Sequence, residues 1–217
     1  MADTSTLIRR LVADVTPVKR LRPPVLRACL WLLAVAAAGV AGILVFANLA
    51  VFFERIGDTA LAIEWTATVA TGILAVVAAF QLSLPDRSPA WALLPLPTLA
   101  FWIGSSGFSC YRNWITAGPT GWELGESANC FMFIMAVGVP LSVSLLLVLR
   151  RAMPLQPLLV AAMGALGVAA LAAGALQFFH PFDVTFLDLG VHLGTIALVV
   201  LGSCAIEAIS RSRVSRL

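Results

Sequence analysis

Charged residues are scarce in this chain of 217 residues, where Asp, Glu, Lys and Arg together make up only 12%. A soluble domain carries about twice that share, because its surface has to be wetted by water. Hydrophobic residues account for 60% of the sequence. Side chains of this kind can cover a protein's outside only where the solvent is lipid. The composition therefore excludes an ordinary soluble enzyme and predicts a membrane protein.

Long polar stretches are also missing, so no separate soluble domain can be placed in the chain. The sequence predicts one membrane domain over residues 28–209, with a cytoplasmic arm at 1–27 before it and a basic cytoplasmic tail at 210–217 after it. The arm does not resemble a cleavable signal peptide, because its many polar and basic residues precede an apolar run that is too long for one.

Six apolar runs are long enough to cross a bilayer, which takes about 20 mostly apolar residues. They cover residues 28–53, 59–84, 91–110, 130–149, 158–180 and 187–209. Each odd-numbered run follows a segment that contains both arginine and proline. The sequence therefore predicts an all-α membrane protein of six transmembrane helices arranged as three hairpins.

Basic residues are distributed very unevenly between the two sides of such an arrangement. Of the fourteen lysines and arginines, only Arg55 and Arg112 fall on one side, and the other twelve fall on the opposite side. Basic residues close to the ends of spans are retained on the cytoplasmic side of a membrane. Both termini are therefore predicted to be cytoplasmic.

Cysteine occurs four times, and no two cysteines form a Cys-x-x-Cys motif. Cys29 and Cys204 fall in or beside spans near the cytoplasmic side, where a thiol packs as a small apolar side chain. Cys110 and Cys130 bracket the only sizeable outer segment, residues 111–129, in a compartment that permits disulfides. Three interpretations stay open for this pair: a structural or reversible disulfide, two metal ligands, or two unrelated thiols.

Both histidines of the chain fall at the outer ends of the last two spans, together with two aspartates. Asp188 and His192 are four residues apart, so on a helix they share a face and can bind one ion. The sequence thus predicts a metal site built from His180, Asp183, Asp188 and His192. The alternative is that each histidine caps a helix end or bonds a backbone carbonyl.

The N-terminal arm contains a short amphipathic pattern over residues 4–15. Its apolar residues fall on one helical face, and Arg10 and Asp14 fall on the other. Three surfaces can cover the apolar face of so short a helix: the lipid interface, the protein's own loops, or a soluble partner. The predicted partner-binding residues are Leu7, Ile8, Arg10, Leu11, Val12, Asp14 and Val15.

Several short motifs resemble, in the same order, those of a family of membrane anti-sigma factors called NrsF. They are Leu7-Ile8-Arg9-Arg10-Leu11, Ala13-Asp14, Pro17-Val18, Arg20-Leu21-Arg22-Pro23-Pro24, Ser106-Gly107 with Cys110 and Trp114, Gly118-Pro119, Cys130-Phe131, Pro140-Leu141, Arg150-Arg151, and His180-Pro181 with Asp183, Thr185 and His192. The sequence departs from the family at Asp188, where the family is more apolar. The proposed ligand role of Asp188 therefore rests on its spacing from His192 alone.

The resemblance implies a six-span protein of the bacterial inner membrane that holds a cytoplasmic ECF-type sigma factor inactive and does not itself bind nucleic acid. It also implies that Cys110 and Cys130 are the sensor pair that responds to an oxidant or a heavy metal, with the metal acting as a signal and no firm cofactor. The expected response is a shift of the third and fourth spans that makes the arm release its sigma factor. The alternatives from other classes are a membrane thiol oxidoreductase, which would need a second cysteine pair, and a small transporter, which would need polar residues in midspan.

Overall fold

The computed structural model describes residues 4–13, 21–47, 49–117, 124–179 and 186–214. These residues are almost entirely helical, and they contain no β-strand. Six helical segments are long and apolar enough to cross a membrane. Their helices are α2 (Pro24–Phe46), α4 (Thr59–Leu82), α5 (Leu96–Ala117), α6 (Leu124–Arg150), α7 (Pro157–Leu176) and α8 (Phe186–Val214). The predicted all-α architecture with six candidate membrane spans is confirmed.

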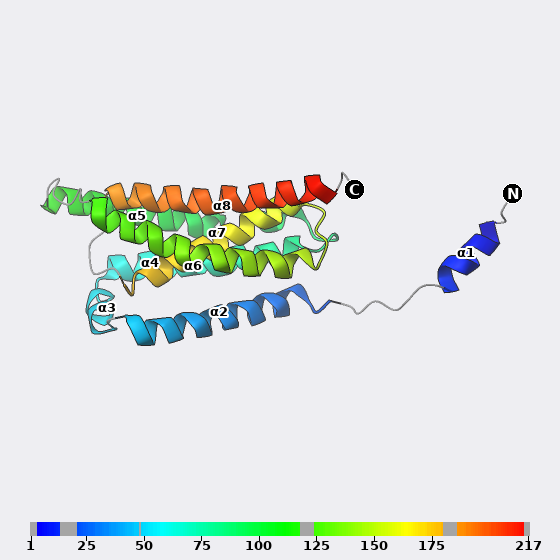
Figure 1. Cartoon of the computed structure of the whole chain (residues 1–217). Coiled ribbons are helices and arrows are strands. Elements are labelled where there is room, and N and C mark those ends of the chain that lie inside the picture. The colour runs from blue at the N-terminus through cyan, green and yellow to red at the C-terminus, as the bar shows by residue number, and fades with distance from the viewer. Residues whose placement is uncertain (1–3, 14–20, 48, 118–123, 180–185, 215–217) are drawn as a thin grey trace.

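Helix α7 occupies the middle of the bundle and packs against α4, α6 and α8 (Figure 1). It consists mainly of alanine, glycine, leucine and valine, and most of its residues are buried. The closest approach is to α4, where Gly72 and Gly167 face each other. A Cβ atom built on Gly167 would lie 2.9 Å from the backbone nitrogen of Val76 and 3.0 Å from the carbonyl oxygen of Gly72. The two helices therefore touch backbone to backbone, which only glycine permits.

The first span is shorter than the apolar run predicts. Helix α2 ends at Phe46, because Ala47 has an extended backbone conformation, and a separate short helix α3 (Leu49–Arg55) follows. Only Pro24 and Ala28 of α2 are buried, so this helix lies at the edge of the bundle. Hydropathy alone could not locate this break, because the residues on both sides of it are apolar.

The middle hairpin differs from its prediction in two respects. Residues 111–129 were expected to form an outer segment, but α5 continues to Ala117 and α6 begins at Leu124. Polar residues do not end a helix, so both helices continue past the apolar runs. In addition, α5 packs mainly on α4 and less on α8, whereas α6 packs on α7 and α8. The two helices thus share α8 as a neighbour.

The bundle has two distinct ends. The N-terminus of α2 and the C-terminus of α8 lie at one end, which we call the terminal end, and α3 lies at the opposite end, which we call the α3 end (Figure 1). The 3-10 helix η1 (Pro89–Leu93) and the turn between α6 and α7 also lie at the terminal end. Arg27, Arg150 and Arg151 belong to these elements, and Arg87 lies in the turn just before η1. Arg55 and Arg112 lie near the α3 end, as the arginine distribution predicts.

Two arginines tie helices together at the terminal end. Arg150 of α6 bonds the carboxylate of Glu207 of α8 through Nε at 2.8 Å and Nη2 at 2.7 Å, and Nη2 also donates to Ser210. Arg27 of α2 donates to the carbonyl of Val148 at 2.8 Å, and its guanidinium lies 5.3 Å from the ring centroid of Phe80. These contacts hold α2, α4, α6 and α8 together on the arginine-rich side.

Candidate functional site

Cys110 and Cys130 both lie inside helices and not at the edges of a loop. Cys110 precedes the end of α5 by seven residues, and Cys130 follows the start of α6 by six. Each is therefore nearly two helical turns into the bundle. Both side chains are 1% exposed. A reagent can therefore react with either cysteine only if it penetrates the bundle or if the helices separate transiently.

Cys130 has apolar surroundings. It forms a buried cluster with Ile134 of its own helix and with Ala172 and Leu176 of α7, against which Phe133 also packs. In this setting a thiol behaves as a small apolar side chain. The contacts of Cys130 therefore place it at the interface between α6 and α7, near the α3 end.

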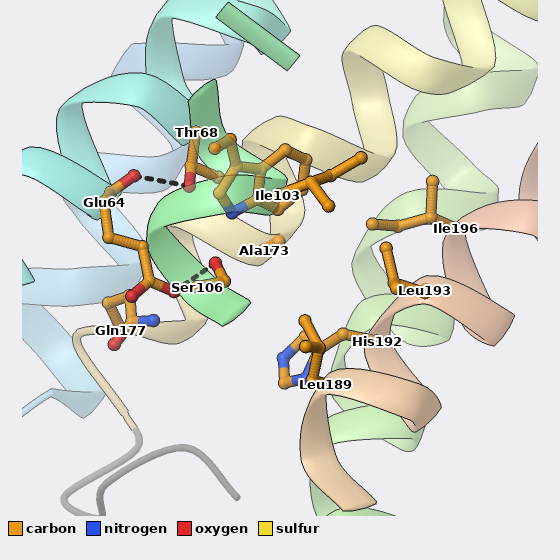
Figure 2. Close-up of a pocket in the computed structure, with 11 residues that line it drawn as sticks. Glu64, Thr68, Ile103, Ser106, Ala173, Gln177, Leu189, His192, Leu193 and Ile196 are labelled. Atoms are coloured by element: carbon orange, nitrogen blue, oxygen red, sulfur yellow. Dashed lines mark hydrogen bonds between the residues drawn. The ribbon is translucent and has the colours of Figure 1, made fainter. Parts of the chain in front are cut away.

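Cys110 has polar and acidic surroundings. The carboxyl groups of Glu64 and Asp188 lie close enough to interact electrostatically with its sulfur. Ser106 precedes Cys110 by one turn of α5, and its hydroxyl donates to Oε1 of Glu64 at 2.7 Å (Figure 2). Glu64 is only 5% exposed and also interacts with the Ser109 hydroxyl. The two predicted sensor cysteines thus have unlike environments, one acidic and one apolar.

Glu64 separates two cavities. One is polar, measures about 270 Å³, and lies among α3, α4 and α5; its walls include Asp58, Leu61, Ser109 and Arg112. The other measures about 30 Å³ and lies deeper, between α4, α5, α7 and α8. Figure 2 shows the Glu64 carboxyl directed toward Ser106, with Gln177 beside it and His192 across the cavity. The deeper cavity has room for about one water molecule, which takes about 30 Å³ in the liquid.

An ion pair lies at the mouth of the larger cavity. Arg112 of α5 donates to a carboxylate oxygen of Asp58 at 2.9 Å, and both side chains are almost half exposed. Asp58 also caps α4 by accepting from the backbone N–H of Ala60 at 2.9 Å. The Ala60 N–H, and after it Arg112, lower the pKa of Asp58 below its ordinary value of 3.8.

This lowered pKa predicts an acid-dependent loss of stability. A carboxyl group with a lower pKa in the folded state stabilises the fold above its unfolded pKa of 3.8, and the effect disappears as the pH falls through the folded pKa. We expect Asp58→Asn to lower the unfolding temperature at neutral pH and to remove this dependence. The measurement is the difference in unfolding temperature between the two proteins in detergent, followed downward from neutral pH. If the difference in unfolding temperature between the two proteins stays constant as the pH falls below 3.8, this explanation is wrong.

The predicted histidine and aspartate site is described only in part. Asp188 is buried, and Nδ1 of His192 donates to its backbone carbonyl at 2.7 Å, one helical turn earlier. His180 and Asp183 lie outside the described residues. Among the residues that the structure describes, no group of three His, Cys, Asp or Glu side chains could hold a metal ion. The four-residue site stays a prediction.

The arm forms the expected helix. Helix α1 (Thr4–Ala13) lies away from the bundle, beyond its terminal end (Figure 1). Four of the predicted partner-binding side chains are more than half exposed: Leu7, Ile8, Leu11 and Val12. The side chain of Arg10 and both Asp14 and Val15 fall outside the described residues. An apolar face of this kind requires a covering surface, because so short a helix is marginal in water.

Sequence reasoning missed Glu64 and Ser106 as members of the site. A signal was present, since Glu64 is an acidic residue inside an apolar run and such residues are costly in a membrane. Its partner Ser106 is 42 residues away on another helix. Only the packing of α4 on α5 brings the two together and places Cys110 beside them.

The comparison with protein families gives one match, which extends over residues 11–211 and therefore over nearly the whole chain. The matching family is described as NrsF, negative regulator of sigma F. No curated protein matches the chain. No solved structure matches it. The family consists of regulators and is not a family of enzymes. Because the match covers the six candidate spans and most of the sequence, the chain belongs to the NrsF family of negative regulators of a sigma factor.

Proposed function

We propose that this protein is a membrane-embedded anti-sigma factor that sequesters an ECF-type sigma factor on α1 and releases it when Cys110 and Cys130 meet an oxidant or a heavy metal. The observation that supports binding of the sigma factor is the exposed apolar face of α1. An amphipathic helix that places its apolar face in a groove of a partner is a common mode of recognition. The family match supports a sigma factor as that partner.

The arginines support a cytoplasmic position for α1. Helix α1 is connected to the terminal end of the bundle, where most of the described arginines of the bundle lie. Basic residues beside spans stay on the cytoplasmic side, which is also where a sigma factor is found. The proposed setting is therefore the inner membrane of a bacterium, with α1 and both termini inside.

The cysteines support an input from the opposite side. Both lie near the α3 end, away from the arginine-rich end. Oxidation or metal capture changes the bonding of sulfur, and in a packed bundle such a change shifts the neighbouring helices. The proposed signal is an oxidant or a thiophilic metal ion that arrives from outside the cell.

Charging the apolar face of α1 tests the output side. We expect the double variant Ile8→Asp/Leu11→Asp to weaken co-purification of the sigma factor by about tenfold or more, because apolar anchors dominate helix docking. Expression of the target genes should then be high without any stress. The control is Thr6→Asp, which adds one negative charge on the opposite face and should retain the sigma factor. Full retention by the double variant would overturn the proposed role of α1.

Removing the sensor thiols tests the input side. We expect Cys110→Ser/Cys130→Ser to keep the target genes repressed and to abolish their induction by oxidants and thiophilic metals. The control is Cys29→Ser/Cys204→Ser, which changes the other two cysteines and should leave induction intact. A reporter gene under the sigma factor's promoter supplies the measurement. Normal induction in the first variant would refute the sensor role.

A further inference from the structure

The larger cavity runs from the surface at the α3 end to a buried floor. Asp58 and Arg112 at its mouth are almost half exposed, whereas Glu64 is only 5% exposed. Glu54 and Arg55 of α3 and Asn113 of α5 complete its mostly polar wall. A polar cavity of about 270 Å³ holds several water molecules, since each takes about 30 Å³ in the liquid. Water can therefore extend from the surface to Glu64.

The floor of this cavity lies next to Cys110. Glu64 and Ser109 both line the cavity, Ser109 is the chain neighbour of Cys110, and the Glu64 carboxyl lies within electrostatic range of the Cys110 sulfur. The deeper cavity, lined by Thr68, Ser106 and His192, begins on the other side of Glu64. Glu64 therefore lines both cavities and interacts electrostatically with the Cys110 sulfur.

Among the described residues, Cys130 has no polar cavity beside it. The side chains grouped with it are those of Ile134, Ala172 and Leu176, and the cavity next to Ala172 has an almost wholly apolar lining that does not favour a water-soluble reagent. A buried thiol can react only with a reagent that reaches it, and the carboxyl groups near Cys110 do not favour its thiolate, so the expected order of reaction rests on access. The two cysteines therefore differ in the property that decides which one reacts first.

We propose that the cavity between α3, α4 and α5 is a water-filled entrance through which small, water-soluble thiol reagents reach Cys110, with Glu64 as its inner gate. Cys110 is then the first cysteine to react, and Cys130 reacts second, from within the bundle. The importance of this order for regulation rests on the proposed function, whereas the entrance itself is a property of the bundle.

Labelling of single-cysteine proteins tests the order of reaction. One protein keeps only Cys110 (Cys29→Ser/Cys130→Ser/Cys204→Ser), and the other keeps only Cys130 (Cys29→Ser/Cys110→Ser/Cys204→Ser). The full chain in lipid vesicles is treated from the α3 side with a membrane-impermeant trimethylammonium methanethiosulfonate. The cysteine sulfur bonds the sulfur of the reagent, methanesulfinate leaves, and the thiol proton passes to water. We expect Cys110 to react roughly tenfold or more faster than Cys130. Equal rates, or a faster Cys130, would overturn the proposal.

A blocking substitution tests the route. Leu61 lines the cavity and is partly buried, so Leu61→Trp should fill the entrance and slow labelling of Cys110 by roughly tenfold. The matched control is Leu147→Trp, at an exposed position on α6 outside both cavities. Misfolding would expose Cys110 and speed its labelling, so slower labelling reports a blocked path. An unchanged rate in Leu61→Trp would show that reagents arrive by another route. Since labelling does not involve a sigma factor, such a failure would leave the proposed anti-sigma activity standing.

Discussion

Replacing Gly167 with valine should lower the free energy of unfolding by about 3 kcal/mol, which is near the upper end for overpacking. The Cβ atom alone would meet the backbone nitrogen of Val76 at 2.9 Å and the carbonyl oxygen of Gly72 at 3.0 Å. Backbone atoms inside a helix cannot rotate aside as a side chain can. Helices α4 and α7 would have to separate along the central contact of the bundle.

A control at a position with open space is Gly194→Ala on α8. A Cβ atom at Gly194 meets nothing within 4 Å, so the change should be neutral or stabilising by up to about 1 kcal/mol through helix propensity. Reversible unfolding of the two variants in detergent, followed by circular dichroism, measures both effects. Equal stability of Gly167→Val and the wild type would mean that α4 and α7 do not touch at this point.

Removing Arg150 is the second change with a large expected effect. Arg150→Met leaves Glu207 without its ion pair, and the Glu207 side chain is only 6% exposed. Loss of one partner of a fully buried pair costs about 3–5 kcal/mol, because the remaining charge is uncompensated. Arg150 itself is 38% exposed, so water already screens the pair and we expect a smaller loss of about 2 kcal/mol. The measurement is again the free energy of unfolding in detergent.

Two further variants separate the charge from the packing. Glu207→Gln should cost less than Arg150→Met, because the arginine that it leaves behind can reach water. The double variant Arg150→Met/Glu207→Met should recover most of the lost stability, since it removes the buried carboxylate as well. A double variant that is less stable than Arg150→Met alone would show that the pair acts through some contact other than its charges.

Most of the fold could be predicted from the sequence, because the bilayer thickness sets the length of a span. The six spans and the grouping of most arginines at one end depend on local properties of the chain. The break at Ala47 and the continuation of α5 to Ala117 could not be predicted in this way. The break at Ala47 occurs between apolar residues, so hydropathy does not change where the helix ends. Beyond Cys110 the residues become polar, but the helix continues.

The candidate site was predicted only in part. Cys110 and Cys130 could be selected from their positions on either side of a polar segment, but their unlike surroundings depend on which helices pack against them. The acidic neighbours of Cys110 come from α4 and α8, and the apolar neighbours of Cys130 include residues of α7. Contacts between residues so distant in the chain leave no pattern in a single sequence.

Helix α8 joins the two ends of the molecule in one uninterrupted segment of 29 residues, about 43 Å long. Its first turns carry Asp188, beside Cys110, and its last turns carry Glu207, which holds Arg150. A helix is stiff along its axis, so it cannot absorb a displacement of its first turns by becoming shorter. An axial slide of the first turns would be carried along the helix toward Arg150, roughly 28 Å away. The molecule therefore contains a lever long enough to span the bilayer.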